Sequence, residues 1–151
     1  MKFTLIVGPI ATICLLLFQS KEIEIGKPLP KDVVIDTSQH YYQIAGASNM
    51  VPAVALTQRG IKYTVVLSIK KEVSFVVTLD SMFKTKDGFK IGTSYKQLRK
   101  KYSGAGQFEP GYGYYFQLAN GWKAMFTNDK VISDGKMHDS YRITSFFKRD
   151  Y

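Results

Sequence analysis

The chain has 151 residues, of which 45% are hydrophobic and 14% aromatic, and it carries a formal net charge of +9. This length suits one compact domain of ordinary size, and the hydrophobic content excludes intrinsic disorder. The single cysteine, Cys14, excludes a small domain held together by disulfides.

The N-terminal segment is predicted to direct export. An uncharged, apolar run extends from Phe3 to Phe18 behind the basic Lys2. This run is longer than a usual signal core of about 7–15 residues and shorter than the roughly 20 residues of a membrane-spanning helix. We therefore assign residues 1–20 to an export signal. A retained membrane anchor and a lipid-modified Cys14 are the alternatives.

Residues 21–151 are then expected to form a single globular domain outside the cytosol, in the periplasm or as a secreted protein. Without Lys2, the 21 basic residues become 20 against 12 acidic ones, which gives a net charge of +8. This domain contains no cysteine, so thiol chemistry is excluded from it. Its stability has to come from a hydrophobic core.

Two stretches in the middle of the chain alternate between hydrophobic and polar residues. The stretch 61–69 has an apolar side chain at every second position, and the stretch 73–79 follows after Lys70-Lys71-Glu72. Such alternation is typical of antiparallel strands that place one face on a core and the other in water. We predict that these two strands form a hairpin.

A second hairpin is predicted in the C-terminal third. The aromatic stretch 112–118 and the stretch 122–127 flank Asn120-Gly121, a pair typical of a type I′ turn. Another strand is expected at 142–148. The polar stretch 128–140 is expected to be a loop, or a hairpin end with a brief strand at 130–132.

One helix is predicted to begin after Ser94. Ser94 and Gln97 have the spacing of a capping box, in which both side chains satisfy free N–H groups at a helix start. Apolar side chains then fall on one face, and cations that suit the helix dipole fill the last turn before Ser103-Gly104. A weaker candidate for a short helical turn is 29–34. The residues of the main helix are Tyr95, Leu98 and Tyr102 on the apolar face and Arg99, Lys100 and Lys101 in the last turn.

Short matches between the two halves of the chain indicate a tandem duplication. The half-repeats would be 21–82 and 83–151, each with one helix and three strands. The expected fold class is α+β, with a mostly antiparallel sheet and one or two short helices packed on it. The matching stretches are 24–26 with 90–92, 60–62 with 121–123, and 74–76 with 145–147.

The start of the predicted helix resembles a repeat found in two known families. The residues concerned are Ile91-Gly92-Thr93-Ser94-Tyr95, Leu98, Tyr102 and Ser103-Gly104. They are similar to the opening of the helix-plus-sheet unit in β-lactamase-inhibitory proteins and in the outer-membrane assembly lipoprotein BamE. The resemblance implies an exported, non-catalytic protein that binds other proteins across its sheet. It covers a short part of each half, so no functional residue is transferred.

The sequence holds no pattern typical of an enzyme or a metal site. His40 and His138 have no cysteine or second histidine at metal-ligand spacing. No serine lies in a Gly-x-Ser-x-Gly turn, and the glycines after the helix lack the order of a dinucleotide-binding loop. We therefore expect no catalysis and no cofactor. The stretch 103–113 is expected to be a mobile loop of the kind that often carries recognition.

A basic segment is the first candidate for a contact surface. Residues 84–101 contain seven lysines and arginines, opposed only by Asp87. Such a surface can attract an acidic protein, lipid headgroups or an anionic polymer, and it can also be a solvated helix face. Nucleic acid is disfavoured as a partner because an exported protein rarely meets it. The basic candidates for partner binding are Lys96, Arg99, Lys100 and Lys101.

An aromatic stretch is the second candidate. On a strand, Tyr112, Tyr114 and Phe116 share one face and Tyr115 points to the other. One set is expected to build the core, and the other set is available for an interface, where aromatic residues are enriched. The aromatic candidates for partner binding are Phe108, Tyr112, Tyr114, Tyr115 and Trp122.

Together these features predict an exported, non-catalytic module that binds another protein, expected to be acidic, and that acts as an inhibitor or immunity-type factor. Aromatic rings would supply affinity, and the surrounding cations would speed the encounter. The alternative is a peripheral envelope protein that binds membranes or anionic polymers through its basic face.

Overall fold

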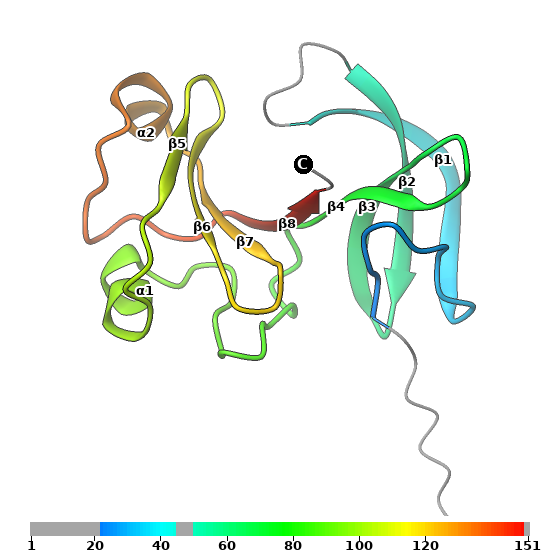
Figure 1. The fold of residues 1–151 in the computed structure, drawn as a ribbon, viewed down its shortest axis with the longest axis horizontal. Coiled ribbons are helices and arrows are strands. Elements are labelled where there is room, and N and C mark those ends of the chain that lie inside the picture. The colour runs from blue at the N-terminus through cyan, green and yellow to red at the C-terminus, as the bar shows by residue number, and fades with distance from the viewer. Residues whose placement is uncertain (1–21, 45–49, 150–151) are drawn as a thin grey trace, which may run out of the picture.

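The computed structural model describes residues 22–44 and 50–149 (Figure 1). The predicted export signal, 1–20, lies outside these residues. Among the helices of the described part, none combines the length and the apolar character needed to cross a membrane.

The described residues form one antiparallel sheet and two short helices, which confirms the predicted α+β fold class. The strands lie in the order β1-β2-β3-β4-β8-β7-β6-β5, so each half of the chain runs from an outer edge of the sheet to its centre. The central pair is β4 and β8, the last strand of each half. The elements are β1 (Val33–Gln43), β2 (Met50–Gln58), β3 (Ile61–Leu67), β4 (Val73–Thr78), α1 (Tyr95–Lys101), β5 (Gln107–Glu109), β6 (Gly113–Gln117), β7 (Lys123–Phe126), α2 (Asp129–Asp134) and β8 (Ser145–Arg149).

The sheet is strongly curved, and its outer strands rise on both sides of the central pair (Figure 1). The ring centroids of Tyr42 in β1 and Phe75 in β4 lie 5.4 Å apart. Three strand spacings separate β1 from β4, which would place these strands about 14 Å apart in a flat sheet. Curvature therefore brings side chains of distant strands together on one face. We call this concave face the inner face and the opposite face the outer face.

The larger hydrophobic core lies on the outer face. Its buried side chains include Leu98, Phe116, Trp122, Phe126 and Phe146, all at most 1% exposed. Helix α1 and the segments 22–30 and 79–94 contribute to this core and cover the outer face. A second, smaller core lies on the inner face and contains Ala53, Val66, Phe75, Val77, Tyr115, Met125 and Phe147.

Helix α1 forms where the sequence predicts it. The Ser94 hydroxyl accepts a hydrogen bond from Gln97 N at 3.2 Å, and Gln97 Oε1 accepts one from Ser94 N at 3.0 Å. Both bonds of the capping box are therefore present. Leu98 is fully buried, and the ring of Tyr95 contacts those of Phe116 and Phe126. Local hydrogen bonding and one apolar stripe are sufficient to place this helix.

The prediction for 128–140 is wrong for its first part, because α2 occupies Asp129–Asp134, whereas 135–140 form the expected loop. Asn128 caps the helix by accepting a hydrogen bond from Val131 N at 2.9 Å, and Gly135 ends it with a φ of 66°. An Asn before and a Gly after the helix are common end signals. They are present in the sequence, but the polar residues between them resemble a loop.

The position of the type I′ turn differs from the prediction. In the turn between β6 and β7, residues 118–122, only Gly121 has a positive φ, and Leu118 O accepts from Gly121 N at 3.2 Å. This is a type I turn followed by a left-handed glycine, which makes a longer connection. Positive φ at two successive residues occurs instead at Arg59 and Gly60, in the two-residue turn between β2 and β3.

The predicted hairpin of 61–69 with 73–79 is confirmed by the pairing of β3 with β4, and that of 112–118 with 122–127 by β6 and β7. Two other expectations need correction. Residues 29–34 form no helical turn, because β1 already begins at Val33. The predicted loop 103–113 contains β5, which pairs with β6.

The two halves of the chain share a pattern of backbone hydrogen bonds next to each central strand, β4 and β8. In each half a glycine with positive φ, Gly26 or Gly92, donates a hydrogen bond to the chain at or near the central strand, and the residue after it accepts one. An isolated bridge follows two positions after each glycine, at Pro28 and at Ser94. The bonds are Gly26 N to Val73 O and Val73 N to Lys27 O, against Gly92 N to Ile143 O and Ile143 N to Thr93 O.

This correspondence agrees with the match of 24–26 with 90–92 and shifts the third match by one residue. The third match aligns Phe75 with Phe146, but these side chains belong to the cores of opposite faces. The hydrogen bonds instead align Val77 with Phe147, which share the inner face. Each half also has four strands rather than three, and both helices follow residue 94.

Candidate binding face

The inner face carries a row of aromatic rings that crosses the sheet. The rings belong to Tyr42, Phe75, Phe147 and Tyr115, from β1, β4, β8 and β6. Successive centroids lie 5.4, 6.1 and 5.6 Å apart. Phe75 and Phe147 are almost fully buried in this row, and two cavities lie beside it on the inner face.

The smaller cavity lies between the two halves and has a volume of about 320 Å³. It is bounded on one side by Tyr42 of β1 and on the other by Gly111 and Tyr112 of the β5–β6 turn. Hydroxyl groups of Thr127 and Ser145 add polar atoms to a mainly aromatic and aliphatic wall. The other lining residues are Phe75, Val77, Met125 and Phe147.

The larger cavity, about 770 Å³, lies over the first half. It shares Tyr42 and Val77 with the smaller cavity, so the two are neighbours along the inner face. Its wall includes polar side chains, among them His40, Lys62 and Asp80. The pKa of the Asp80 carboxyl lies below its usual range, chiefly because the backbone N–H groups of Lys62 and Met82 donate to it.

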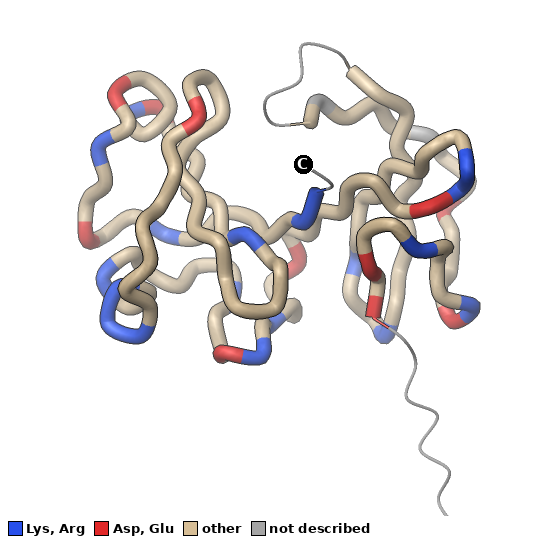
Figure 2. Tube along the Cα trace, viewed as in Figure 1, with Lys and Arg blue, Asp and Glu red and all other residues tan. Residues whose placement is uncertain are grey.

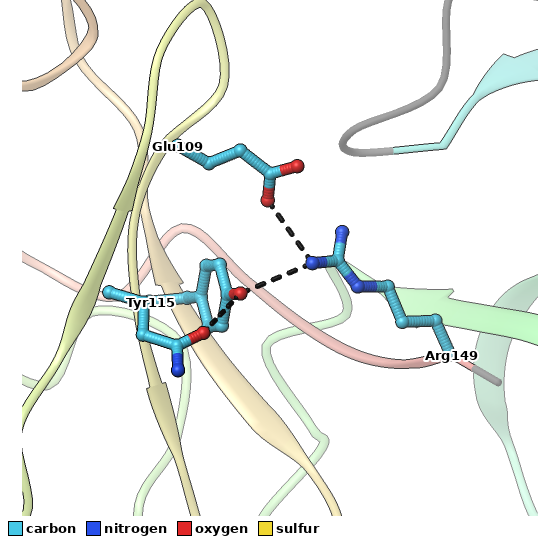
Figure 3. Close-up of polar contacts among 4 residues, drawn as sticks. Glu109, Tyr115 and Arg149 are labelled. Carbon is cyan, nitrogen blue, oxygen red and sulfur yellow. Dashed lines mark hydrogen bonds and ion pairs between the residues drawn. The ribbon is translucent and has the colours of Figure 1, made fainter. Parts of the chain in front are cut away.

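A polar network anchors the second half of the inner face (Figure 3). Arg149 Nη2 donates to Glu109 Oε2 at 3.2 Å and to the Tyr115 hydroxyl at 3.1 Å. The Tyr115 hydroxyl in turn donates to Gln107 Oε1 at 2.5 Å. The guanidinium is well shielded, since the Arg149 side chain is 7% exposed and that of Glu109 is 18% exposed. The network joins the last strand, β8, to the edge strand β5.

Two cations lie near the aromatic rings of Tyr115 and Phe147. Lys123 Nζ lies 5.3 Å from the Tyr115 ring centroid and 5.5 Å from that of Phe147. Arg149 Cζ lies 5.4 and 5.5 Å from the same two rings. Such distances are those of cation–π contacts. Burial lowers the pKa of Lys123, and the nearby Arg149 charge lowers it further, while Glu109 opposes the shift.

The outer face has a matched arrangement in which the cation is neutralised. Lys148 Nζ lies 4.7 Å from the Trp122 ring and 3.3 Å from Glu22 Oε1. Trp122 Nε1 also donates to Glu22 Oε1 at 2.8 Å. Burial is the largest influence on Glu22 and opposes ionisation, but the Trp122 and Lys148 contacts outweigh it and lower the pKa.

The predicted aromatic candidates are divided between the two faces. Tyr115 and Tyr112 belong to the inner face, as the network and the smaller cavity show. Tyr114 packs against the outer core, as the alternation predicts for the neighbour of Tyr115. Trp122 is 1% exposed in that core and offers no surface to a partner. Phe108 is 38% exposed and its ring packs against Gly135 after α2.

The basic candidates do not join the aromatic face. Lys96, Arg99, Lys100 and Lys101 are exposed on α1, whose apolar side packs into the outer core. Figure 2 shows their charge around α1, away from the space between the two arms of the sheet. Arg99 Nη1 donates to Gly104 O at 2.7 Å. The predicted single surface of rings and cations is therefore two surfaces.

The residues that define the inner face were not predicted from the sequence. Tyr42, Phe75, Phe147, Lys123 and Arg149 meet there only through the curvature of the sheet and the pairing of β4 with β8. The alternation of 73–79 indicates that Phe75 and Val77 share a face, but no local signal identifies their partners from the other half.

The described residues contain no group of three or more His, Cys, Asp or Glu side chains arranged to hold a metal ion. His40 is hydrogen-bonded to Ser38 at 3.2 Å, and His138 Nδ1 to Ser140 Oγ at 2.8 Å. Each histidine therefore has a local hydroxyl partner within its own segment.

Comparison with known proteins adds a fold and no family. No protein-family model matches the chain, and no curated protein matches it. Among solved structures, the chain is similar to the uncharacterized protein yfeY from Escherichia coli, with a TM-score of 0.50 and 17% sequence identity. The similarity covers 75% of this chain and 80% of that one. At this identity the likeness concerns the fold alone, and it leaves the resemblance to β-lactamase-inhibitory proteins and BamE as a prediction.

Proposed function

We propose that the protein is an exported, non-catalytic module that binds another protein through its inner face, as an inhibitor or immunity-type factor. The observation that carries the proposal is the pair of neighbouring cavities on the concave inner face. Much of the opposite, outer face is covered by α1 and by the segments 22–30 and 79–94. A concave surface with rings, aliphatic groups and a few polar atoms is typical of a recognition site.

Adjacent tyrosines on β1 offer a direct test of which face binds. Tyr42 lines both cavities, whereas Tyr41 is 68% exposed and neighbours on a strand point to opposite faces. A photo-reactive phenylalanine analogue is placed at Tyr42, at Tyr112 or, as the matched control, at Tyr41. The cells that produce the protein are then irradiated.

We expect one dominant crosslinked protein from Tyr42 and Tyr112, identified by mass spectrometry, and little or none from Tyr41. The same product from Tyr41 at equal yield contradicts the assignment of the inner face. Crosslinks from none of the three positions contradict protein binding by this face altogether.

A second candidate function, membrane or anionic-polymer binding, is favoured by the cations beside Glu22. Glu22 lines a recess of about 190 Å³ together with Arg59, Lys84 and Lys86. If cells retain 1–20 as an anchor, these cations lie next to a membrane surface, where each contributes about 1 kcal/mol with anionic lipids.

Vesicles with and without phosphatidylglycerol test the second candidate with the full chain. The double variant Lys84→Gln/Lys86→Gln is expected to weaken the salt-sensitive part of binding roughly thirtyfold. The control Lys70→Gln/Lys71→Gln removes equal charge from the exposed β3–β4 turn. Equal losses in both variants would mean that total charge, and not this site, attracts the lipid.

A further inference from the structure

We infer that Lys123, Arg149 and the smaller cavity form a subsite for an extended, acidic segment of the partner protein, with an apolar side chain in the cavity and a carboxylate at the cations. This inference rests on the proposed function and gives it a chemical preference.

The cations at the centre of the sheet support this subsite. Of its three shielded cations, Lys148 has Glu22 and Arg149 has Glu109 as carboxylate partners. Among the residues that the structure describes, no carboxylate forms an ion pair with Lys123. Within the described part of the chain, its ammonium lies over the faces of Tyr115 and Phe147, beside the like charge of Arg149.

A carboxylate from the partner protein would stabilise the charged form of Lys123. Half-burial removes part of the water that stabilises the ammonium, and a like charge nearby destabilises it further. A negative group near Lys123 and Arg149 reverses both effects, while Glu109 already neutralises one of the two cations. Counted over the described residues, Lys123, Arg149 and Glu109 leave one positive charge in a partly dry place, where a charge pair is stronger than at an open surface.

The second argument is the position of the cavity. Met125 lines it, and Lys123 lies two residues earlier on the same strand and the same face. Two residues along a strand span about 6.6 Å. Phe147 lies between the cavity and the cations. It lines the cavity, and its ring is in cation–π contact with Lys123 and Arg149.

This spacing matches an extended peptide. Side chains at i and i+2 of an extended segment point to the same side and are also about 6.6 Å apart. An apolar residue in the cavity therefore places the side chain two positions away at Lys123. The sequence preference is apolar-x-acidic, and Gly111 and Tyr112 on one side with Tyr42 on the other would flank the segment.

An exposed lysine outside both cavities supplies a control of equal charge. Lys70 lies in the β3–β4 turn and is exposed, whereas Lys123 is half-buried over two rings. The change Lys70→Gln thus removes one positive charge without altering either cavity.

The experiment is a titration of the isotope-labelled protein, as cells process it, followed by NMR. The probes are the tripeptide amides acetyl-Phe-Ser-Glu, acetyl-Phe-Ser-Gln and acetyl-Phe-Glu-Ser. We expect the first to shift signals around Met125 and Phe147 and to bind about fivefold more tightly than the other two, a factor that corresponds to about 1 kcal/mol. The second lacks the charge, and the third presents it on the opposite side.

The variants give the second comparison. Lys123→Gln is expected to abolish the preference for Glu over Gln, Lys123→Arg to retain it, and Lys70→Gln to leave it unchanged. Equal binding of all three peptides, or equal loss in Lys123→Gln and Lys70→Gln, overturns the inference. The spectra themselves report whether each variant is folded.

Two further outcomes separate this inference from other possibilities. Tight binding of dodecanoate with no binding of the Glu peptide would make the subsite one for a free fatty acid and overturn the peptide assignment. Crosslinking from Tyr42 that persists while the peptides fail to discriminate would leave the proposed function intact and reject only the acidic preference.

Discussion

Trp122 Nε1 donates a hydrogen bond to Glu22 Oε1 at 2.8 Å and so ties the first described residue of the chain to the centre of the outer core. Lys148 Nζ approaches the same oxygen at 3.3 Å. The N-terminal segment, the β6–β7 hairpin and β8 therefore meet at one carboxylate.

This contact predicts an acid-dependent loss of stability. The pKa of Glu22 is lower in the folded protein than its usual value of 4.5, so its stabilising effect is complete above that value and is lost as the pH falls through the folded pKa. We expect Glu22→Gln to cost about 1 kcal/mol at neutral pH, after allowance for its partial exposure. The two proteins should converge in acid.

Urea unfolding as a function of pH measures this difference, with Glu24→Gln as the control because Glu24 is an exposed neighbour in the same segment. A gap between wild type and Glu22→Gln that stays constant into acid would show that the carboxylate is not responsible.

A second prediction concerns close packing of the backbone at Gly113. Its φ is 132°, and a Cβ there would lie 2.4 Å from the carbonyl oxygen of Phe126 in the adjacent strand. Gly113→Ala should destabilise the protein by more than about 3 kcal/mol. Gly111→Ala, where no atom lies within 4 Å of the added Cβ, should cost only about 1 kcal/mol. Thermal unfolding of both variants gives the comparison, and equal costs would refute the steric argument.

A third prediction is a stabilising change in the β3–β4 turn. Lys71 has a φ of 60°, a left-handed conformation that Asn adopts more readily than Lys. We expect Lys71→Asn to raise the free energy of unfolding by about 0.5 kcal/mol. Lys70→Asn removes the same charge from a neighbour without a positive φ and should bring no gain. If both variants gain equally in chemical denaturation, charge and not backbone conformation is the cause.

A fourth prediction tests the cap of α2. Asn128→Ala removes the acceptor for Val131 N and should cost about 1 kcal/mol, together with faster amide exchange in α2. Asn128→Asp retains an acceptor and should leave exchange nearly unchanged. Loss of protection in both variants would mean that the side-chain cap does not hold this helix.

Elements with strong local signals were predictable. The Ser94–Gln97 capping box and one apolar stripe place α1, and alternation places the hairpins, because neighbouring residues alone decide these features. Helix α2 was not predicted because its six residues are mostly polar. Its helical state depends on Asn128, Gly135 and the burial of Val131. The type I′ turn at Arg59 and Gly60 was not predicted because the pairing of β2 with β3 holds Arg59 at a positive φ.

The candidate site was predictable only in part. The sequence indicated that Tyr112 and Tyr115 lie in an aromatic hairpin, but Trp122 belongs to the core because the strand faces and the Glu22 contact direct it inward. The basic residues of α1 lie near this hairpin in sequence, yet the helix packs on the outer face and carries its charge away from the rings.

By itself, the sequence determined the antiparallel α+β class, the helix α1, the two hairpins and the excess of positive charge, since each depends on composition or on residues close along the chain. Only the tertiary structure decided that β4 and β8 meet at the centre and that the sheet curves. Those two features depend on contacts between residues about 70 positions apart, such as Phe75 and Phe147. For that reason the inner face, its cavities and the contacts of Lys123 with two aromatic rings have no counterpart in any local pattern of the sequence.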